Sequence, residues 1–170
     1  MSRQSTALTA ASGEHYVAYK LSAMGYPVAM TRGGSPTVDL MVGDLAGHAV
    51  SIQVKTSRWA RRQYVRSNTK NRWEWDVGHK VMYIRSDTIF YAFVDLKWGS
   101  SQPPDVFIVP SNIVADAIKP EFKRAMFWIM EGFAEHFQER WDRITERLTP
   151  VEPVGTAPDT EQEDAEEPGG

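Results

Sequence analysis

At 170 residues, 42% of them apolar, the chain is long enough for one globular domain with a core. It has no cysteine, which excludes disulfides and thiolate zinc sites, and no apolar run of membrane-spanning length. A soluble, cytoplasmic protein without a membrane partner is expected. The net charge of -3 is unevenly distributed, because residues 152–170 hold seven acids and no Lys or Arg, which leaves 19 basic against 15 acidic residues elsewhere.

The composition of the two ends predicts one domain between flexible segments. Residues 1–11 are small and polar, and residues 150–170 mix Pro, Gly, Thr and acids without periodicity. Neither stretch offers enough apolar surface to offset the entropy of ordering it. A single domain over residues 12–149 is therefore expected, followed by an acidic disordered tail.

A helix is predicted from Gly13 to Met24, with Ser12 as its N-cap and Gly25 as its C-terminal stop. Glu14 lies on or beside the apolar stripe of this helix. A single acid in a first turn more often complements the helix dipole than forms part of a site. The residues that the fold brings beside Glu14 must therefore decide its role.

Alternating apolar and polar residues predict β-strands in the next segment. The expected strands cover residues 26–31, 37–42 and 49–56. Residues 44–48 separate the last two strands and suit a three-residue hairpin loop, with Gly47 in the left-handed conformation. Counting back from this loop places Asp39 opposite Gln53, on the same face of the sheet.

The second half of the chain predicts further strands and two helices. Strand patterns cover residues 88–96 and 105–109, and Ser111 is expected to cap a short helix through Ile118. Between residues 120 and 148, apolar and aromatic side chains recur at three- and four-residue steps. This spacing predicts one long amphipathic helix from Pro120 to Leu148, which packs on the sheet or pairs two chains in a homodimer.

Residues 55–85 form a basic segment, with nine Lys or Arg against two acids. Clustered cations neutralise phosphates, although basic runs are also common on ordinary solvated surfaces. The candidate nucleic-acid-binding residues are Arg58, Arg61, Arg62, Arg66, Lys70 and Arg72. Trp59, Trp73 and Trp75 lie among them and suit stacking on unpaired bases, while burial in the core explains them almost equally well.

The candidate catalytic residues are Glu14, Asp39, Gln53 and Lys55. Phosphodiester hydrolysis needs a positioned water and neutralisation of growing charge, which hard divalent cations supply. Mg²⁺ prefers oxygen ligands, and Asp39, Gln53 and Glu14 offer them. Lys55 follows Gln53 by two residues on the same strand face, where its ammonium group can hold the attacking water. Each residue alone has an ordinary surface explanation, so only their predicted convergence favours a site.

The same residues carry a family resemblance. The segments Gly13-Glu14, Val38-Asp39 and Gln53-Val54-Lys55-Thr56 resemble the motif series of the PD-(D/E)XK nuclease superfamily, with spacing similar to that of small Holliday-junction-resolvase-like domains. The resemblance covers about residues 12–118. It implies a restriction-endonuclease-like α/β fold, in which a mixed central β-sheet is flanked by helices. It also implies a nuclease that uses Mg²⁺, with Mn²⁺ as a possible substitute.

Two positions depart from the family pattern. Val38 stands where Pro is usual, which should alter backbone stiffness more than chemistry. Gln53 stands where Glu or Asp is usual, so the site loses one negative charge and its affinity for the metal should fall. Family members that resemble this Gln form are implied to remain active.

The first hypothesis is therefore a metal-dependent endonuclease that hydrolyses DNA phosphodiester bonds. The alternative is a nuclease-fold module, catalytically weak or inactive, that binds nucleic acid or assembles with a partner and has Gln53 as its signature. A third hypothesis is a protein-interaction adaptor that uses the acidic tail and the aromatic helix. Steeply salt-dependent binding to nucleic acid would argue against the adaptor.

Overall fold

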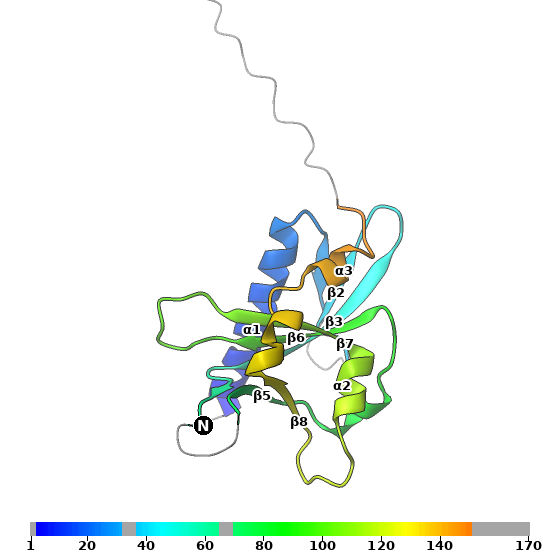
Figure 1. The fold of residues 1–170 in the computed structure, drawn as a ribbon. Helices are drawn as coiled ribbons and strands as arrows, with labels where there is room; N and C mark the ends of the chain where they lie inside the picture. The colour runs from blue at the N-terminus through cyan, green and yellow to red at the C-terminus, as the bar shows by residue number, and fades with distance from the viewer. Residues whose placement is uncertain (1–2, 32–36, 65–69, 151–170) are drawn as a thin grey trace, which may run out of the picture.

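The computed structural model describes residues 3–31, 37–64 and 70–150, and contains a five-stranded β-sheet in the order β1-β2-β3-β6-β7 (Figure 1). Neighbouring strands run antiparallel except β3 and β6, which run parallel. The strands are β1 Val28–Met30, β2 Leu40–Gly43, β3 Ala49–Ser57, β6 Ile89–Asp95 and β7 Asp105–Pro110. All five coincide with or overlap the strand segments predicted from the sequence, so the α/β class with a mixed central sheet is confirmed.

A second, three-stranded sheet begins within the connection between the parallel strands β3 and β6. Such a crossover is usually an α-helix. Here it holds β4 (Arg61–Arg62), β5 (Arg72–Asp76) and the 3-10 helix η1 (His79–Tyr83), and β5 pairs with the later strand β8 (Met126–Met130). Figure 1 shows β5 and β8 next to each other outside the main sheet. The described part of residues 57–79 therefore contributes to a second layer.

The side chains of β3 point alternately to the two faces of the main sheet, and a hydrophobic core lies on each face. The side chains that face the first core from β3 are Val50, Ile52 and Val54. Helix α1 (Arg3–Ala23) covers that face. On the opposite face, Trp75 of β5 packs on Phe93 and Phe107 with ring-centroid distances of 5.1 and 5.6 Å. The predicted helical flank is present on the first face, while the second sheet covers the other face beside α2 (Ser111–Ala117).

Helix α1 begins at Arg3, ten residues before the predicted start, so the expectation of an irregular N-terminal segment is wrong from Arg3 onward. Alanines at three of positions 7–11 favour the helical conformation there. Ser12 lies inside the helix, and its hydroxyl donates to the Leu8 carbonyl at 2.7 Å instead of capping. The predicted stop is confirmed, because Gly25 follows the helix with a φ of 88°. No helix in the described part of the chain combines the length and apolar character of a membrane span.

The predicted hairpin loop between β2 and β3 is confirmed. The Asp44 N–H donates to the His48 carbonyl at 3.0 Å, and Gly47 has a φ of 89°. The Asp44 carboxylate accepts the N–H groups of Thr149 and His48 at 2.8 and 2.9 Å. These hydrogen bonds, the one from Thr149 above all, lower the pKa of Asp44 to about 2. The hairpin thus anchors the end of the described chain.

The predicted long helix from Pro120 to Leu148 is wrong. The segment forms β8, the 3-10 helix η2 (Glu131–His136) and the short helix α3 (Asp142–Thr145). Burial alternates along β8 with the period of a strand, because its second and fourth residues are buried while the third, Trp128, is 49% exposed. The three- and four-residue recurrence suits a helix, and pairing with the edge of β5 selects the strand instead. The apolar helix face suggested for a homodimer is therefore not formed.

Ser111 starts helix α2 but does not cap it. Its hydroxyl donates to the Ser86 carbonyl at 2.9 Å and accepts the Ser86 N–H at 3.0 Å. The side chain therefore fastens the helix to the loop before β6, and no side-chain hydrogen bond caps the helix.

Candidate active site

Strand β3 extends beyond its neighbour β2 and leaves one edge open. Strand β2 pairs with residues 49–52 of β3, whereas β6 pairs with residues 51–57 on the other side. From Gln53 to Ser57, the β2 side of β3 therefore has no strand partner within the described ranges. The backbone groups and side chains near this edge are available for other contacts.

Asp39 lies at the start of this open edge. Its N–H donates to the Ile52 carbonyl at 2.9 Å, and its carboxylate Oδ2 accepts the Val54 N–H at 2.7 Å. Because the N–H and C=O of one strand residue point to the same side, the Val54 carbonyl also faces this edge. The predicted pairing of Asp39 with Gln53 is not formed, since the β2–β3 ladder ends at Leu40 and the carboxylate docks on the strand edge instead.

Gln53 and Lys55 lie on the face of β3 that looks toward the second core, in register with Tyr91 and Phe93 of β6. Lys55 is half-buried, and Gln53 is 9% exposed. The Oε1 atom of Gln53 is buried and accepts no hydrogen bond from the described groups. A buried acceptor without a donor costs about 1–3 kcal/mol, so this oxygen indicates a bound ligand or water.

Tyr91 is a neighbour of Gln53 that the sequence did not single out. Its hydroxyl is buried and has no hydrogen-bond partner in the described structure, and burial raises its pKa to about 12. The phenol is therefore a neutral donor at physiological pH. An unpartnered donor and an unpartnered acceptor on adjacent strands suit one small polar ligand, such as a water molecule. Because Tyr91 lies within the apolar strand β6, its sequence context does not indicate a buried polar donor. The register of β6 with β3 places it beside Gln53.

Glu14 comes near Asp39 because α1 approaches β3 very closely. A Cβ atom on Gly13 would lie 1.9 Å from Oγ1 of Thr56, so only glycine permits this approach. The pKa of Glu14 is raised, first by burial and then by the negative charge of Asp39, while His15 lowers it. The two carboxylates therefore lie within electrostatic range of each other, as the spacing of the motifs predicts.

The donor atoms along this edge are oxygens, the kind of ligand that a hard divalent cation prefers. Among the described residues, no three His, Cys, Asp or Glu side chains gather at one point. Glu14 and Asp39 supply only two carboxylates, and the unpartnered Gln53 oxygen with the Val54 carbonyl would complete a set of oxygen ligands. A cation there would also relieve the repulsion between the carboxylates, which is the second cause, after burial, of the raised pKa of Glu14.

Glu14→Gln is expected to raise the melting temperature at pH 7.5 in EDTA. Because folding raises the pKa of Glu14 above its ordinary value of 4.5, the folded state binds this proton more tightly than the unfolded state does. The stability gained from this proton is present below pH 4.5 and is lost as the pH rises through the folded pKa. Removing the charge should therefore stabilise the protein near neutrality and have little effect at pH 4. Thermal unfolding at both pH values checks this, with exposed Glu121→Gln as the control. A lower melting temperature at pH 7.5 would contradict it.

The predicted nucleic-acid-binding arginines are partly neutralised by acids. Arg61 forms an ion pair with Glu131, and both Arg62 and Arg72 contact Glu74, at 3.4 and 2.7 Å. The basic segment is therefore less positive on the surface than its sequence indicates. Arg58 donates to the Thr9 hydroxyl at 3.1 Å, Lys70 is exposed, and Arg66 lies outside the described residues.

The three tryptophans of this segment have different environments. Trp73 and Trp75 are 7% and 2% exposed and belong to the second core, so stacking of these two on nucleic-acid bases is excluded in this fold. Trp59 is 50% exposed. It lies on the loop between β3 and β4, directly after the candidate site strand. Trp59 alone of the three retains the predicted capacity for stacking.

Asp95 is a buried acid that the sequence did not mark, and its role is structural. It is 1% exposed, and its carboxylate accepts the N–H groups of Ala60 and Arg61 at 3.0 and 3.2 Å. It therefore holds the loop that carries Trp59 in one conformation. Its position at the end of an apolar strand was the signal available in the sequence. A buried carboxylate there needs hydrogen-bond donors from another segment of the chain.

Comparison of the chain with protein-family models, with curated proteins and with solved structures gave no match. The resemblance to the PD-(D/E)XK superfamily therefore rests on the sequence motifs alone.

Proposed function

We propose that the protein is a metal-dependent nuclease that hydrolyses DNA phosphodiester bonds at the open edge of β3. The observation that carries the proposal is the buried, unpartnered Oε1 of Gln53 on the same strand whose Val54 N–H binds the Asp39 carboxylate. Glu14, electrostatically coupled to Asp39, and Lys55, two residues after Gln53, complete the group. An ordinary solvent-facing hairpin has no reason to bury an amide oxygen without a donor.

Each residue has a distinct part in this proposal. Asp39 and Glu14 hold the cation, with Gln53 as a neutral oxygen ligand. A bound divalent cation neutralises charge on the phosphate and lowers the pKa of a coordinated water. The Lys55 ammonium group donates a hydrogen bond to the attacking water and stabilises the negative charge that grows on the phosphate oxygens. Because one usual carboxylate is replaced by Gln53, we expect activity to require high concentrations of Mg²⁺ or Mn²⁺.

The alternative of a nuclease-fold module without hydrolysis makes a different prediction from the same site. It keeps binding to nucleic acid through the basic surface and lacks cleavage under every metal condition. The neutral Gln53 favours it over an active nuclease, because an amide adds no negative charge to the metal site. One assay separates these functions.

Purified protein is expected to cleave DNA in Mg²⁺ or Mn²⁺ but not in EDTA, and Asp39→Ala should lower the rate roughly 100-fold or more. The assay offers supercoiled, linear, branched and single-stranded DNA and RNA, with products separated on gels. Asp116→Ala is the matched control, because it also removes one carboxylate but lies on α2, with 68% of its side chain exposed. Equal cleavage by both variants would overturn the proposal, as would no cleavage by the wild type. Binding without cleavage would establish the alternative.

A further inference from the structure

A pocket lies at the carboxyl end of β3, beside the candidate site. Its volume is about 350 Å³, and Trp59 forms part of its wall. The other lining residues carry hydroxyl or guanidinium groups and include no acid: Thr6, Thr9, Thr56, Ser57, Arg58 and Arg62. Hydroxyl and guanidinium donors together are the usual partners of phosphate oxygens.

The backbone on both sides of Trp59 is held firmly while its ring stays accessible. Asp95 binds the N–H of the next residue, Ala60, which is fully buried. On the other side, the Arg58 carbonyl accepts the Trp98 N–H at 3.0 Å, and the Arg58 guanidinium lies 4.6 Å from the centre of the Trp98 ring. A half-exposed indole on a preorganised loop loses little conformational entropy when it binds a flat ligand.

Trp59 also lines a second cavity, of about 450 Å³, with Gln63, Lys97 and Gln102. The indole therefore stands between two hollows. One is rich in groups that bind phosphate, and the other contains amide side chains that can contact a base or sugar edge. This arrangement suits a single nucleotide better than a peptide, because it combines an aromatic platform with anion donors on one side of it.

Arg62 can turn toward a phosphate without leaving an acid unpaired. Its partner Glu74 also accepts hydrogen bonds from Arg72 at 2.7 Å and from the Tyr64 hydroxyl at 3.2 Å. These contacts lower the pKa of Glu74 against the effect of its burial. Arg62 is the most distant of the three partners, at 3.4 Å, and its side chain is 48% exposed.

We infer that Trp59 and the adjoining hydroxyl-and-guanidinium pocket bind an unpaired nucleotide of a DNA substrate, the base stacking on the indole and the phosphate entering the pocket. The inference deepens the proposed function and relies on it for the identity of the substrate. Arg58 follows Lys55 by three residues, which corresponds to roughly 10 Å along an extended strand. The pocket and the candidate site would therefore contact neighbouring nucleotides of one DNA strand. Because bases in a duplex are already stacked, the substrate class is single-stranded or branched DNA with unpaired nucleotides.

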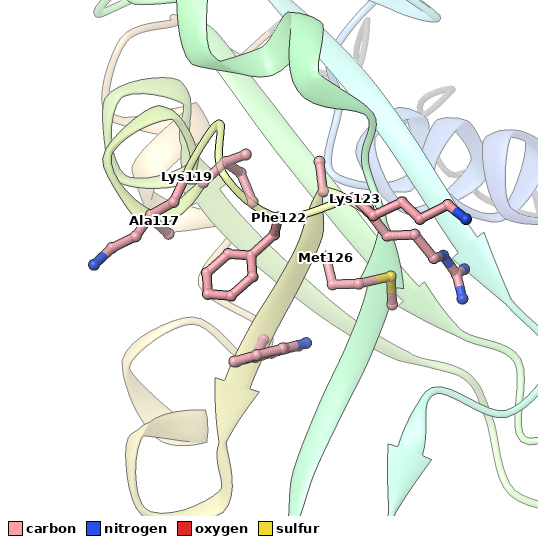
Figure 2. A pocket seen from close by; sticks show the side chains of 9 residues that line it. Ala117, Lys119, Phe122, Lys123 and Met126 are labelled. Atoms are coloured by element: carbon pink, nitrogen blue, oxygen red, sulfur yellow. The ribbon is translucent and has the colours of Figure 1, made fainter.

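A competing surface provides the control. A cavity of about 620 Å³ lies between the end of α2 and β8 and is lined by apolar groups with cations at its rim. Figure 2 shows the Phe122 ring over this cavity with Met126 beside it, while Lys123 extends away. Trp128 belongs to its wall and is 49% exposed, which matches the 50% of Trp59. Nothing in this cavity singles out one partner, so Trp128 serves here as an indole of matched exposure that lines neither of the two cavities beside Trp59.

The test measures binding of a fluorescent single-stranded DNA oligonucleotide, and of its duplex, by anisotropy in EDTA, where cleavage cannot occur. The single strand should bind more tightly, and Trp59→Ala should weaken it roughly 5- to 150-fold, with partial retention in Trp59→Phe. Trp128→Ala should leave the affinity unchanged. Arg62→Gln should weaken binding and reduce the salt dependence by about one phosphate contact.

Two results would overturn the inference: equal affinity for both DNA forms with no effect of Trp59→Ala, or a loss confined to Trp128→Ala. Thermal unfolding of each variant separates a loss of binding from a loss of folding.

The result of this binding test is also independent of hydrolysis. Binding that depends on Trp59, without cleavage in any metal, would refute the nuclease and keep the nucleotide site. Metal-dependent cleavage of duplex DNA that is unaffected by Trp59→Ala would support the nuclease and refute the nucleotide site.

Discussion

Lys55→Gln is expected to lower the rate of metal-dependent DNA cleavage by roughly 100- to 1000-fold, the usual cost of removing one donor that stabilises charge in a transition state. Lys55 is half-buried on β3, two residues from Gln53, where its ammonium group would meet both the attacking water and the phosphate. Single-turnover cleavage with saturating DNA measures the chemical step separately from binding. The unfolding transition should stay nearly unchanged, because the substitution keeps a polar side chain of similar length.

Two further variants define the role of Lys55. Lys80→Gln removes one positive charge from η1, where the side chain is exposed, and should leave cleavage unaffected. Lys55→Arg keeps the charge and should retain part of the activity if Lys55 positions water and stabilises the phosphate. If Lys55→Arg is as inactive as Lys55→Gln and the acidic limb of the pH–rate profile disappears, Lys55 acts instead as a general base. Full activity of Lys55→Gln would remove Lys55 from the site.

Gly13→Ala is expected to reduce both the free energy of unfolding and cleavage. Alanine is favoured over glycine inside a helix by about 1 kcal/mol. Against this gain, the new Cβ would lie 1.9 Å from Oγ1 of Thr56 and 2.9 Å from its Cβ and Cγ2. Rotation of Thr56 cannot move its own Cβ, so α1 must shift away from β3, and overpacking of this kind typically costs about 1–3 kcal/mol. The shift also carries Glu14 away from Asp39.

Denaturant unfolding measures the stability of Gly13→Ala, and the double variant Gly13→Ala/Thr56→Ala supplies the control. Truncating Thr56 removes the contacts at its Oγ1 and Cγ2, so the double variant should recover part of the lost stability. Thr56→Ala alone should have a small effect on folding. If Gly13→Ala is stabilised by about 1 kcal/mol, as in an exposed helix, the close packing of α1 on β3 is refuted.

The hairpin shows why some of the fold was predictable. The loop length, the glycine at position 47 and the alternation of its strands are local properties, and together they predict the register that β2 and β3 adopt. The same locality explains why the Gln53 and Lys55 side chains share one face of β3 as expected. Asp39 departs from the extrapolated pairing because the ladder ends at Leu40, a point that depends on the chain before β2 rather than on the hairpin.

The second sheet shows where local patterns fail. The apolar spacing of residues 120–148 suits a helix, yet Met126–Met130 pairs with β5, a strand more than fifty residues earlier in the chain. A strand forms there because β5 offers an unpaired backbone edge and the second core accepts Phe127 and Ile129. Neither condition can be read from the segment itself.

The sequence by itself therefore determined the α/β class, the positions of the main strands along the chain and the hairpin, and it proposed the four candidate site residues, since each of these depends on short-range periodicity or residue chemistry. Only the tertiary structure decided which basic and aromatic residues are available for binding, because ion pairing and burial depend on elements distant in the chain. Trp59 and Trp73 illustrate the difference: both lie in the same basic segment, and only the packing of the second sheet buries one and exposes the other.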